Sequence, residues 1–241
     1  MEPTLTQAAP PAPVAAPIVP AAPVTSPAPT SPPAPAITQY SRLEFRRKFW
    51  KWFGAEINVT DPATEQSVGY IKMKAWKLRE DVRLFSDQTM QTEIIRINAR
   101  QIIDFGATYD ITDSATNLPL ASLRRKGWKS ALVRDYWEIL DTTGTVIGEV
   151  KETSGTLALM RRWLGTISDL FDLIFMFVVQ TYTINDTRSG TPVQAASIIH
   201  RKNPAVVKMG LDATNNQANM DPRILIAATA LLSIMDAAKN A

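Results

Sequence analysis

Cysteine is absent from the 241-residue chain, which excludes disulfides, thiol catalysis and cysteine-based metal sites. Histidine occurs once, at His200. A metal site built on several histidines is therefore excluded, and a catalytic triad would depend on this one residue. His200 lies in the alternating run PVQAASIIHR (192–201), where we predict a histidine on the surface of a strand rather than a general base. No GxGxxG, GxxxxGK[ST] or GxSxG motif occurs, so we expect no catalytic site.

Long apolar runs are also missing. Residues 170–179 and 224–235 are each shorter than the roughly 20 residues of a helix that spans a bilayer. No charge lies between Glu2 and Arg42, so the basic start of a secretion signal is absent. The net charge of +3 is too small to imply nucleic acid, which is not an expected partner. We expect a cytoplasmic protein, either free or peripheral to a membrane.

The amino-terminal segment is rich in proline. Residues 3–38 hold most of the 17 prolines, separated mainly by Ala, Val, Thr and Ser and without an aromatic residue. Proline removes backbone donors, and alanine buries too little area to offset the entropy of ordering. Residues 1–39 are therefore predicted to be a disordered tail of polyproline II type. A spacer is the favoured interpretation, and a ligand for a proline-binding protein partner is the alternative.

The composition changes at Tyr40, where a lead-in segment of residues 40–54 begins with YSRLEFRRKFWKWF. Aromatic side chains fall at helical spacing, with basic residues between them. One interpretation places this segment in a bilayer interface, with its rings at headgroup depth and its cations on anionic lipid. The other is a helix or strand that docks its aromatics on the domain's own core. The membrane-surface candidates are Phe45, Phe49, Trp50, Trp52 and Phe53.

An internal repeat is the most informative feature. INVTDP (57–62), YDITDS (109–114) and YTINDT (182–187) share alternating apolar residues followed by Asp, and a second alternating run ending in bases follows each. A related hairpin joins WEILD (137–141) to TVIGEVKE (145–152). Such alternation around polar turns predicts antiparallel hairpins, with each Asp accepting from a backbone amide two residues on. A β-barrel or strongly curled sheet is favoured, because closure removes unpaired edges.

Two segments break the strand pattern. Residues 156–170 are predicted to be helical, and the mostly apolar strand FDLIFMFVVQTYTI follows them. Residues 221–238 read DPRILIAATALLSIMDAA, in which Asp221 is the predicted N-cap and Pro222 the first helical residue. This second helix is apolar on nearly every face, so it is either buried in a core or inserted in a membrane. Its length of about 25 Å suits the interior of a barrel better than a bilayer.

The three repeated strands, the KAWK and KGWK stretches after the hairpins, VIGEVKE and the terminal DPRILIAATALLSIMD together resemble the tubby-like C-terminal superfamily, in its LURP-one-related and phospholipid scramblase branch. The resemblance implies a mainly β domain over residues 55–241, with a closed twelve-stranded antiparallel barrel around the buried C-terminal helix. It also implies a non-enzymatic protein that interacts with phospholipid or a membrane surface, with at most a scramblase-like lipid transport activity.

The chain departs from that family in two respects. Scramblases are thought to bind calcium through an acidic segment before the terminal helix. Here the corresponding stretch is LDATNNQANMD, in which Asp212 and Asp221 are the only charged residues and so the only calcium candidates. Calcium needs about six to eight oxygen ligands, so we predict no cofactor. The cysteines that carry acyl chains in those proteins are absent, and binding of anionic phospholipid is the property that transfers best.

Basic residues recur after the hairpins, and equivalent repeats would gather them at one rim of the barrel, where each contributes about 1 kcal/mol near an anionic membrane. The alternative is that they are solvated outward positions neighboured by acids. The lipid-binding candidates are Lys72, Lys74, Lys77, Arg124, Arg125, Lys126, Lys129, Arg201 and Lys202. Arg161, Arg162 and Trp163 form a second membrane-facing candidate, with a helix packed on the barrel wall as the alternative.

A second function from another class fits the same sequence. The globular domain is, in this alternative, a soluble protein-interaction or structural module that the proline-rich tail tethers to a partner. Deleting residues 1–38 separates the two hypotheses, because it abolishes partner capture in the second and leaves vesicle binding unaffected in the first.

Overall fold

The computed structural model describes residues 36–50, 54–73, 81–101, 106–126, 136–153, 179–201 and 207–239. The chain divides into units Met1–Ser31 and Pro32–Ala241, and all the described residues belong to the second unit. Most of the proline-rich tail (1–35) and the predicted helix at 156–170 lie outside the described residues.

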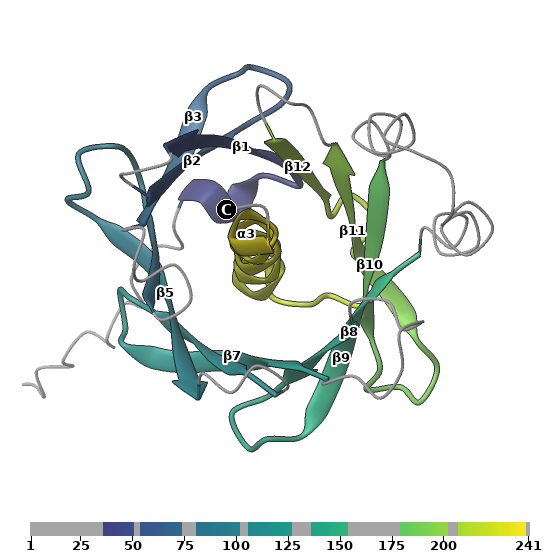
Figure 1. Cartoon of the computed structure of the whole chain (residues 1–241). Helices are drawn as coiled ribbons and strands as arrows, with labels where there is room; N and C mark the ends of the chain where they lie inside the picture. Colours follow the sequence, from purple (N-terminus) through teal and green to yellow (C-terminus); the bar gives the residue numbers. More distant parts are fainter. Residues whose placement is uncertain are drawn as a thin grey trace, which may run out of the picture. The chain divides into compact units, whose positions relative to one another are not determined.

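The sheet is a closed antiparallel barrel in which each strand pairs with its neighbours in sequence and β1 pairs with β12 (Figure 1). This confirms the predicted fold class. The described residues form twelve strands: β1 Arg42–Trp50, β2 Gly54–Thr60, β3 Ser67–Met73, β4 Asp81–Phe85, β5 Glu93–Gln101, β6 Thr108–Asp113, β7 Leu118–Arg125, β8 Tyr136–Leu140, β9 Val146–Glu152, β10 Gln180–Asp186, β11 Val193–Arg201 and β12 Val207–Asp212. The three repeated segments lie in β2, β6 and β10 and in the turns that follow them.

Helix α3 (Pro222–Lys239) runs through the interior of the barrel, as Figure 1 shows end-on. Every residue from Ile224 to Met235 is buried, so the sequence prediction of an enclosed apolar helix is confirmed. The start of the helix is also as predicted. Asp221 accepts a hydrogen bond from the Arg223 amide at 2.9 Å, and Pro222 is the first helical residue.

The end of the barrel at which the even-numbered strands finish is called the turn end. An aspartate at the end of each of these strands accepts a hydrogen bond from the backbone amide two residues further on. These residues are Asp61, Asp87, Asp113, Asp141, Asp186 and Asp212. The predicted role of the aspartates as turn openers is therefore confirmed, and it extends to all six even-numbered strands.

Residues 40–54 do not form a separate lead-in segment, because β1 is an integral strand of the barrel paired with both β2 and β12. The domain begins earlier still. The 3-10 helix η1 (Ala36–Gln39) lies inside the barrel (Figure 1), where Ile37 is fully buried. Gly69 of β3 makes room for it, since a Cβ at Gly69 would lie 2.9 Å from Ile37 Cδ1.

Two strand glycines in different surroundings give opposite predictions for substitution by alanine. A Cβ at Gly148 of β9 would lie 2.7 Å from the carbonyl oxygen of Asn185. We expect Gly148→Ala to lower the free energy of unfolding by about 1–3 kcal/mol. A Cβ at Gly210 of β12 would meet only the Ile199 carbonyl, at 3.9 Å, so Gly210→Ala should stabilise the fold by up to about 1 kcal/mol. Urea unfolding of both variants measures this difference, and equal effects would contradict it.

The turn end gives the protein a defined acid sensitivity. Hydrogen bonds, foremost from the Ala63 amide to Asp61 and from the Thr143 hydroxyl to Asp141, hold the pKa of both carboxyls below the ordinary value of 3.8. Because the folded-state pKa is the lower one, this stabilisation is present above pH 3.8 and is lost as the pH falls through the folded-state values. Asp61→Asn/Asp141→Asn should therefore make the decline in stability below about pH 4 shallower. Urea unfolding across this range, with wild type in parallel, provides the measurement.

Candidate functional site

The opposite end of the barrel, called the loop end, is where the odd-numbered strands finish. The connections that start and finish there are residues 51–53, 74–80, 102–107, 126–135, 153–179 and 202–206, and most of their residues lie outside the described ranges. Their sequences carry four of the six tryptophans, namely Trp52, Trp76, Trp128 and Trp163. At the turn end, a segment follows each of the six even-numbered strands, and the last of them, 213–221, leads into the C-terminal helix. These six segments contain no aromatic residue. The sequences of the segments that join the strands at the two ends therefore differ in chemical character.

The repeats bring predicted basic residues to the loop end, at the ends of β3, β7 and β11. The described candidates there are Lys72, Arg124, Arg125, Lys126 and Arg201. Lys74, Lys77, Lys129 and Lys202 lie outside the described residues, as do Trp52, Phe53, Arg161, Arg162 and Trp163. The described candidates therefore lie towards the same end of the barrel, on three strands that are separated from one another by three others around the sheet.

Several of these bases have acidic neighbours, as the alternative interpretation expected. Lys72 Nζ lies 3.8 Å from Glu56, and Arg124 and Lys126 contact the same carboxylate, Glu138, at 2.5 and 2.9 Å. Burial acts to raise the pKa of Glu138, but hydrogen bonds and charges from Lys126 and Arg124 outweigh it and lower the pKa. Two cations share one carboxylate here, so the cluster of Arg124, Lys126 and Glu138 carries one net positive charge. Its two basic side chains are exposed to solvent.

Arg125 differs from the other candidates in direction. It pairs across the sheet with Trp137, a buried residue, and its guanidinium carbon lies 5.8 Å from the centre of the Trp137 ring. This is the distance of a cation–π contact. Arg125 continues the inward-facing series of Ala121 and Leu123, so the alternative of a solvated outward position is wrong for this residue.

The aromatic lead-in prediction is also corrected. Phe45 is fully buried in the hydrophobic core, because it alternates with outward residues along β1 and faces α3. It is therefore not a membrane-surface residue, and the alternative in which it docks on the domain's own core holds. Phe49 and Trp50 lie on the same strand, but their side chains lie outside what the structure describes.

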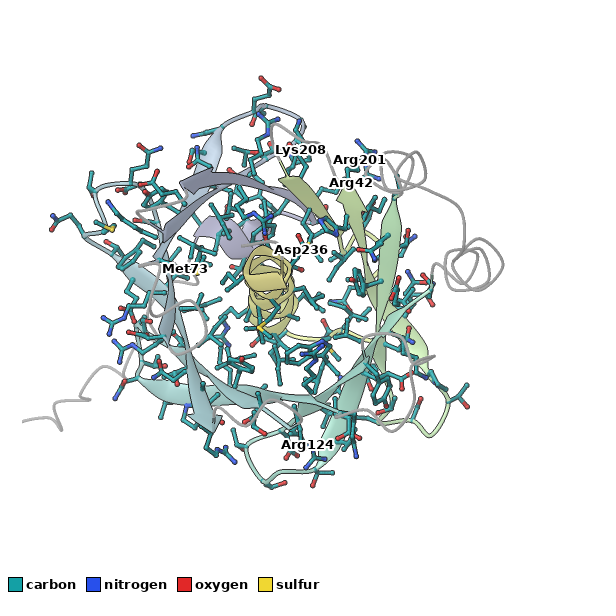
Figure 2. The ribbon with its side chains drawn as sticks, in the orientation of Figure 1. Arg42, Met73, Arg124, Arg201, Lys208 and Asp236 are labelled. Carbon is teal, nitrogen blue, oxygen red and sulfur yellow. The ribbon has the colours of Figure 1, made fainter. Side chains whose placement is uncertain are left out.

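A polar cluster that the sequence analysis missed lies inside the barrel towards the loop end, where Figure 2 places Asp236 beside the helix. Arg47 Nη1 lies 3.4 Å from Asp236 Oδ2 and donates to the Ser233 carbonyl at 3.0 Å. His200 is fully buried, with Nε2 3.5 Å from Asp236 Oδ2 and Nδ1 3.2 Å from Gln180 Oε1. The prediction of a surface histidine is wrong. Arg47 belongs to the same buried series as Leu43 and Phe45, and His200 to that of Ala196 and Ile198. This shared face was the available signal.

The electrostatics of this cluster indicate a structural role. Burial lowers the pKa of Arg47, and the charge and hydrogen bond of Asp236 oppose this shift. The cluster links strands β1 and β11 to the C-terminal part of α3. At the other end of the helix, Arg223 contacts Asp113 of β6 at 2.5 Å. Charged contacts to the barrel wall therefore hold the helix near both of its ends.

The calcium candidates are engaged with basic side chains. Asp212 accepts from Arg42 at 3.0 Å and from the Thr214 amide, and Asp221 contacts Arg223 at 2.5 Å. Burial opposes ionisation of both carboxyls, but their hydrogen bonds, to Thr214 and Arg223 respectively, lower the pKa of each. Within the described ranges, no group of three or more His, Asp or Glu side chains is placed to hold a metal ion.

Comparisons with protein-family models, curated proteins and solved structures find no match to this chain. Among the described residues, no helix combines the length and the apolar character needed to cross a membrane. The resemblance to tubby-like proteins therefore rests on the sequence motifs, and the function has to be argued from the barrel itself.

The buried pair of Arg47 and Asp236 should be far more important for stability than an exposed pair. Removing one partner of a buried pair leaves an uncompensated charge, so Arg47→Met should lower the free energy of unfolding by about 3–5 kcal/mol. The control is Arg42→Met, which removes the exposed pair with Asp212 and should cost at most about 1 kcal/mol. Urea unfolding of the two variants tests this, and a loss below about 1 kcal/mol for Arg47→Met would show that the cluster does not anchor the helix.

Proposed function

We propose that the protein is a non-enzymatic phospholipid-interacting protein that meets an anionic membrane surface with the loop end of its barrel. The observation that carries the proposal is the contrast between the two ends. Aspartates and short polar segments build the turn end. The sequences that connect the strands at the loop end carry four of the six tryptophans, and the described candidate bases lie at the ends of β3, β7 and β11.

This combination matches the chemistry of a membrane interface. Tryptophan is favoured at headgroup depth because its ring is apolar and its N–H is polar. Lysine and arginine near an anionic surface each contribute about 1 kcal/mol. The acidic turn end would be repelled by the same surface, so the distribution of charge also supports one orientation, with the loop end towards the lipid.

The barrel interior supports surface binding rather than passage of lipid through the protein. Helix α3 occupies the interior, and apolar side chains of the strands pack around it. A lipid chain would have to displace this core. We therefore propose binding at the loop end and its rim, without transfer of lipid through the barrel.

The test is flotation of the full chain with vesicles of phosphatidylcholine containing phosphatidylserine. Lys72→Gln/Lys126→Gln removes two exposed loop-end charges and should weaken binding by roughly tenfold or more at low salt. Arg42→Gln/Arg188→Gln removes two exposed turn-end charges and should leave binding unchanged. For the aromatic contribution, Trp163→Ser should weaken binding, and Leu118→Ser at the turn end is its matched control.

Three results would overturn the proposal: no binding, binding solely to neutral vesicles, or equal losses from the loop-end and turn-end variants. Deletion of residues 1–35, which keeps η1 and its buried Ile37, separates a tail-dependent protein partner from lipid. It should leave flotation intact, and loss of flotation on that deletion would also contradict the proposal.

A further inference from the structure

We infer that the outer wall formed by β1, β12 and β11 carries a binding site for a phosphate monoester. The wall holds three cations in one cross-strand row. Arg46 of β1 pairs directly with Lys208 of β12, and Lys208 pairs directly with Arg201 of β11. All three alternate with buried residues on their strands, so they face outward. Figure 2 labels Lys208 and Arg201 on this wall.

Such a row is unfavourable in a sheet without an anion. Directly opposed residues have Cβ atoms about 4.5–5.5 Å apart, and like charges in these positions destabilise the pairing. A sheet selected for stability alone would place an acid or a neutral residue in the middle strand. Lys208 instead lies between two arginines.

The acids around the row offset it only in part. Glu44 contacts both Arg46 and Lys208, the latter at 3.3 Å. Burial opposes ionisation of Glu44, but the hydrogen bond and charge of Arg46 and the charge of Lys208 lower its pKa. Glu65 reaches Arg46 at 3.3 Å but is 75% exposed, so solvent screens it. Arg201 has no ionic partner within the described part of the chain.

A glycine beside the row supplies an independent observation. Gly210 faces outward one step from Lys208 on β12, with Glu44 and Ile199 as its cross-strand neighbours. It lies in regular pairing on both sides, and among the described residues a Cβ there would meet nothing closer than the Ile199 carbonyl at 3.9 Å. Neither a bulge, a positive φ nor crowding by the described residues therefore requires glycine here. One use of a glycine within a strand is to let a ligand approach the backbone closely.

The charges specify the class of ligand. Three cations against Glu44 and the screened Glu65 leave an excess of one to two positive charges. A phosphate monoester carries about −1.5 to −2 at neutral pH, and the arginine fork binds its oxygens in a bidentate manner. A phosphodiester or carboxylate carries a single charge and neutralises only the lower of the two values of this excess. The phosphate can belong to a lipid headgroup, which rests on the proposed function, or to a soluble ester, which does not.

The soluble source is tested with the full chain and glycerol 3-phosphate, by NMR titration of backbone amides. We expect shifts centred on β12 and about tenfold weaker binding in Arg201→Gln. Gly210→Val should weaken binding similarly, because the valine side chain would cover the backbone of β12 that the phosphate approaches. The free energy of unfolding should stay equal or rise. Matched controls are Gly106→Val, whose Cβ would meet no atom within 4 Å, and Arg42→Gln at the turn end. Neither control should change the affinity.

The lipid source is tested with vesicles of equal surface charge that contain either phosphatidic acid or phosphatidylserine. Tighter binding to phosphatidic acid, lost in Gly210→Val and Arg201→Gln, supports the site on a membrane. Vesicle binding with no preference for phosphatidic acid and no response to glycerol 3-phosphate overturns the inference and leaves the proposed function standing. Binding of glycerol 3-phosphate without vesicle binding supports the site and removes the membrane proposal. Shifts that Gly210→Val does not alter would falsify the placement on this wall.

Discussion

Enclosure of an apolar helix is the constraint on which the rest of this structure depends. Residues 224–235 of α3 are buried on every side, so no face of the helix can be left to water. A sandwich or an open sheet covers one side of a helix, whereas a closed barrel covers all of them. Closure by the pairing of β1 with β12 also removes the unpaired edges of the sheet. One arrangement thus satisfies both the helix and the strands.

An apolar helix in an apolar cavity has little to fix its rotation and depth, and the charged contacts near its two ends supply this. Arg223 contacts Asp113 of β6, while Asp236 lies between Arg47 of β1 and His200 of β11. These contacts come from distant strands, so they set the helix against the barrel as a whole. A buried polar group that fixes register at some cost in stability is a documented use of such groups, and it accounts for charge in an otherwise apolar interior.

The hairpins and the enclosed helix could be predicted because both depend on local periodicity. Alternation and the Asp residues identified the strands that begin at Ile57, Tyr109 and Tyr182, and the all-round apolar character of 224–235 indicated enclosure. The interior charges could not be inferred in this way. Alternation reveals which residues share a face, and it places Arg47 with Leu43 and Phe45, but charge alone suggested an outward side chain. Only the partner from α3, almost 190 positions away, makes an inward arginine stable.

The division between folding and binding follows from the same period of two. On β12, Met209 and Leu211 face the core, while Lys208 and Gly210 lie between them on the outer wall. The inner residues pack against the core around α3, so substitutions there are expected to destabilise the fold. The outer series contributes little to that packing, so it is free to carry an unfavourable row of cations and an unneeded glycine. Features that lower stability on the outside of a well-enclosed core point to binding rather than to folding, and this wall holds two of them side by side.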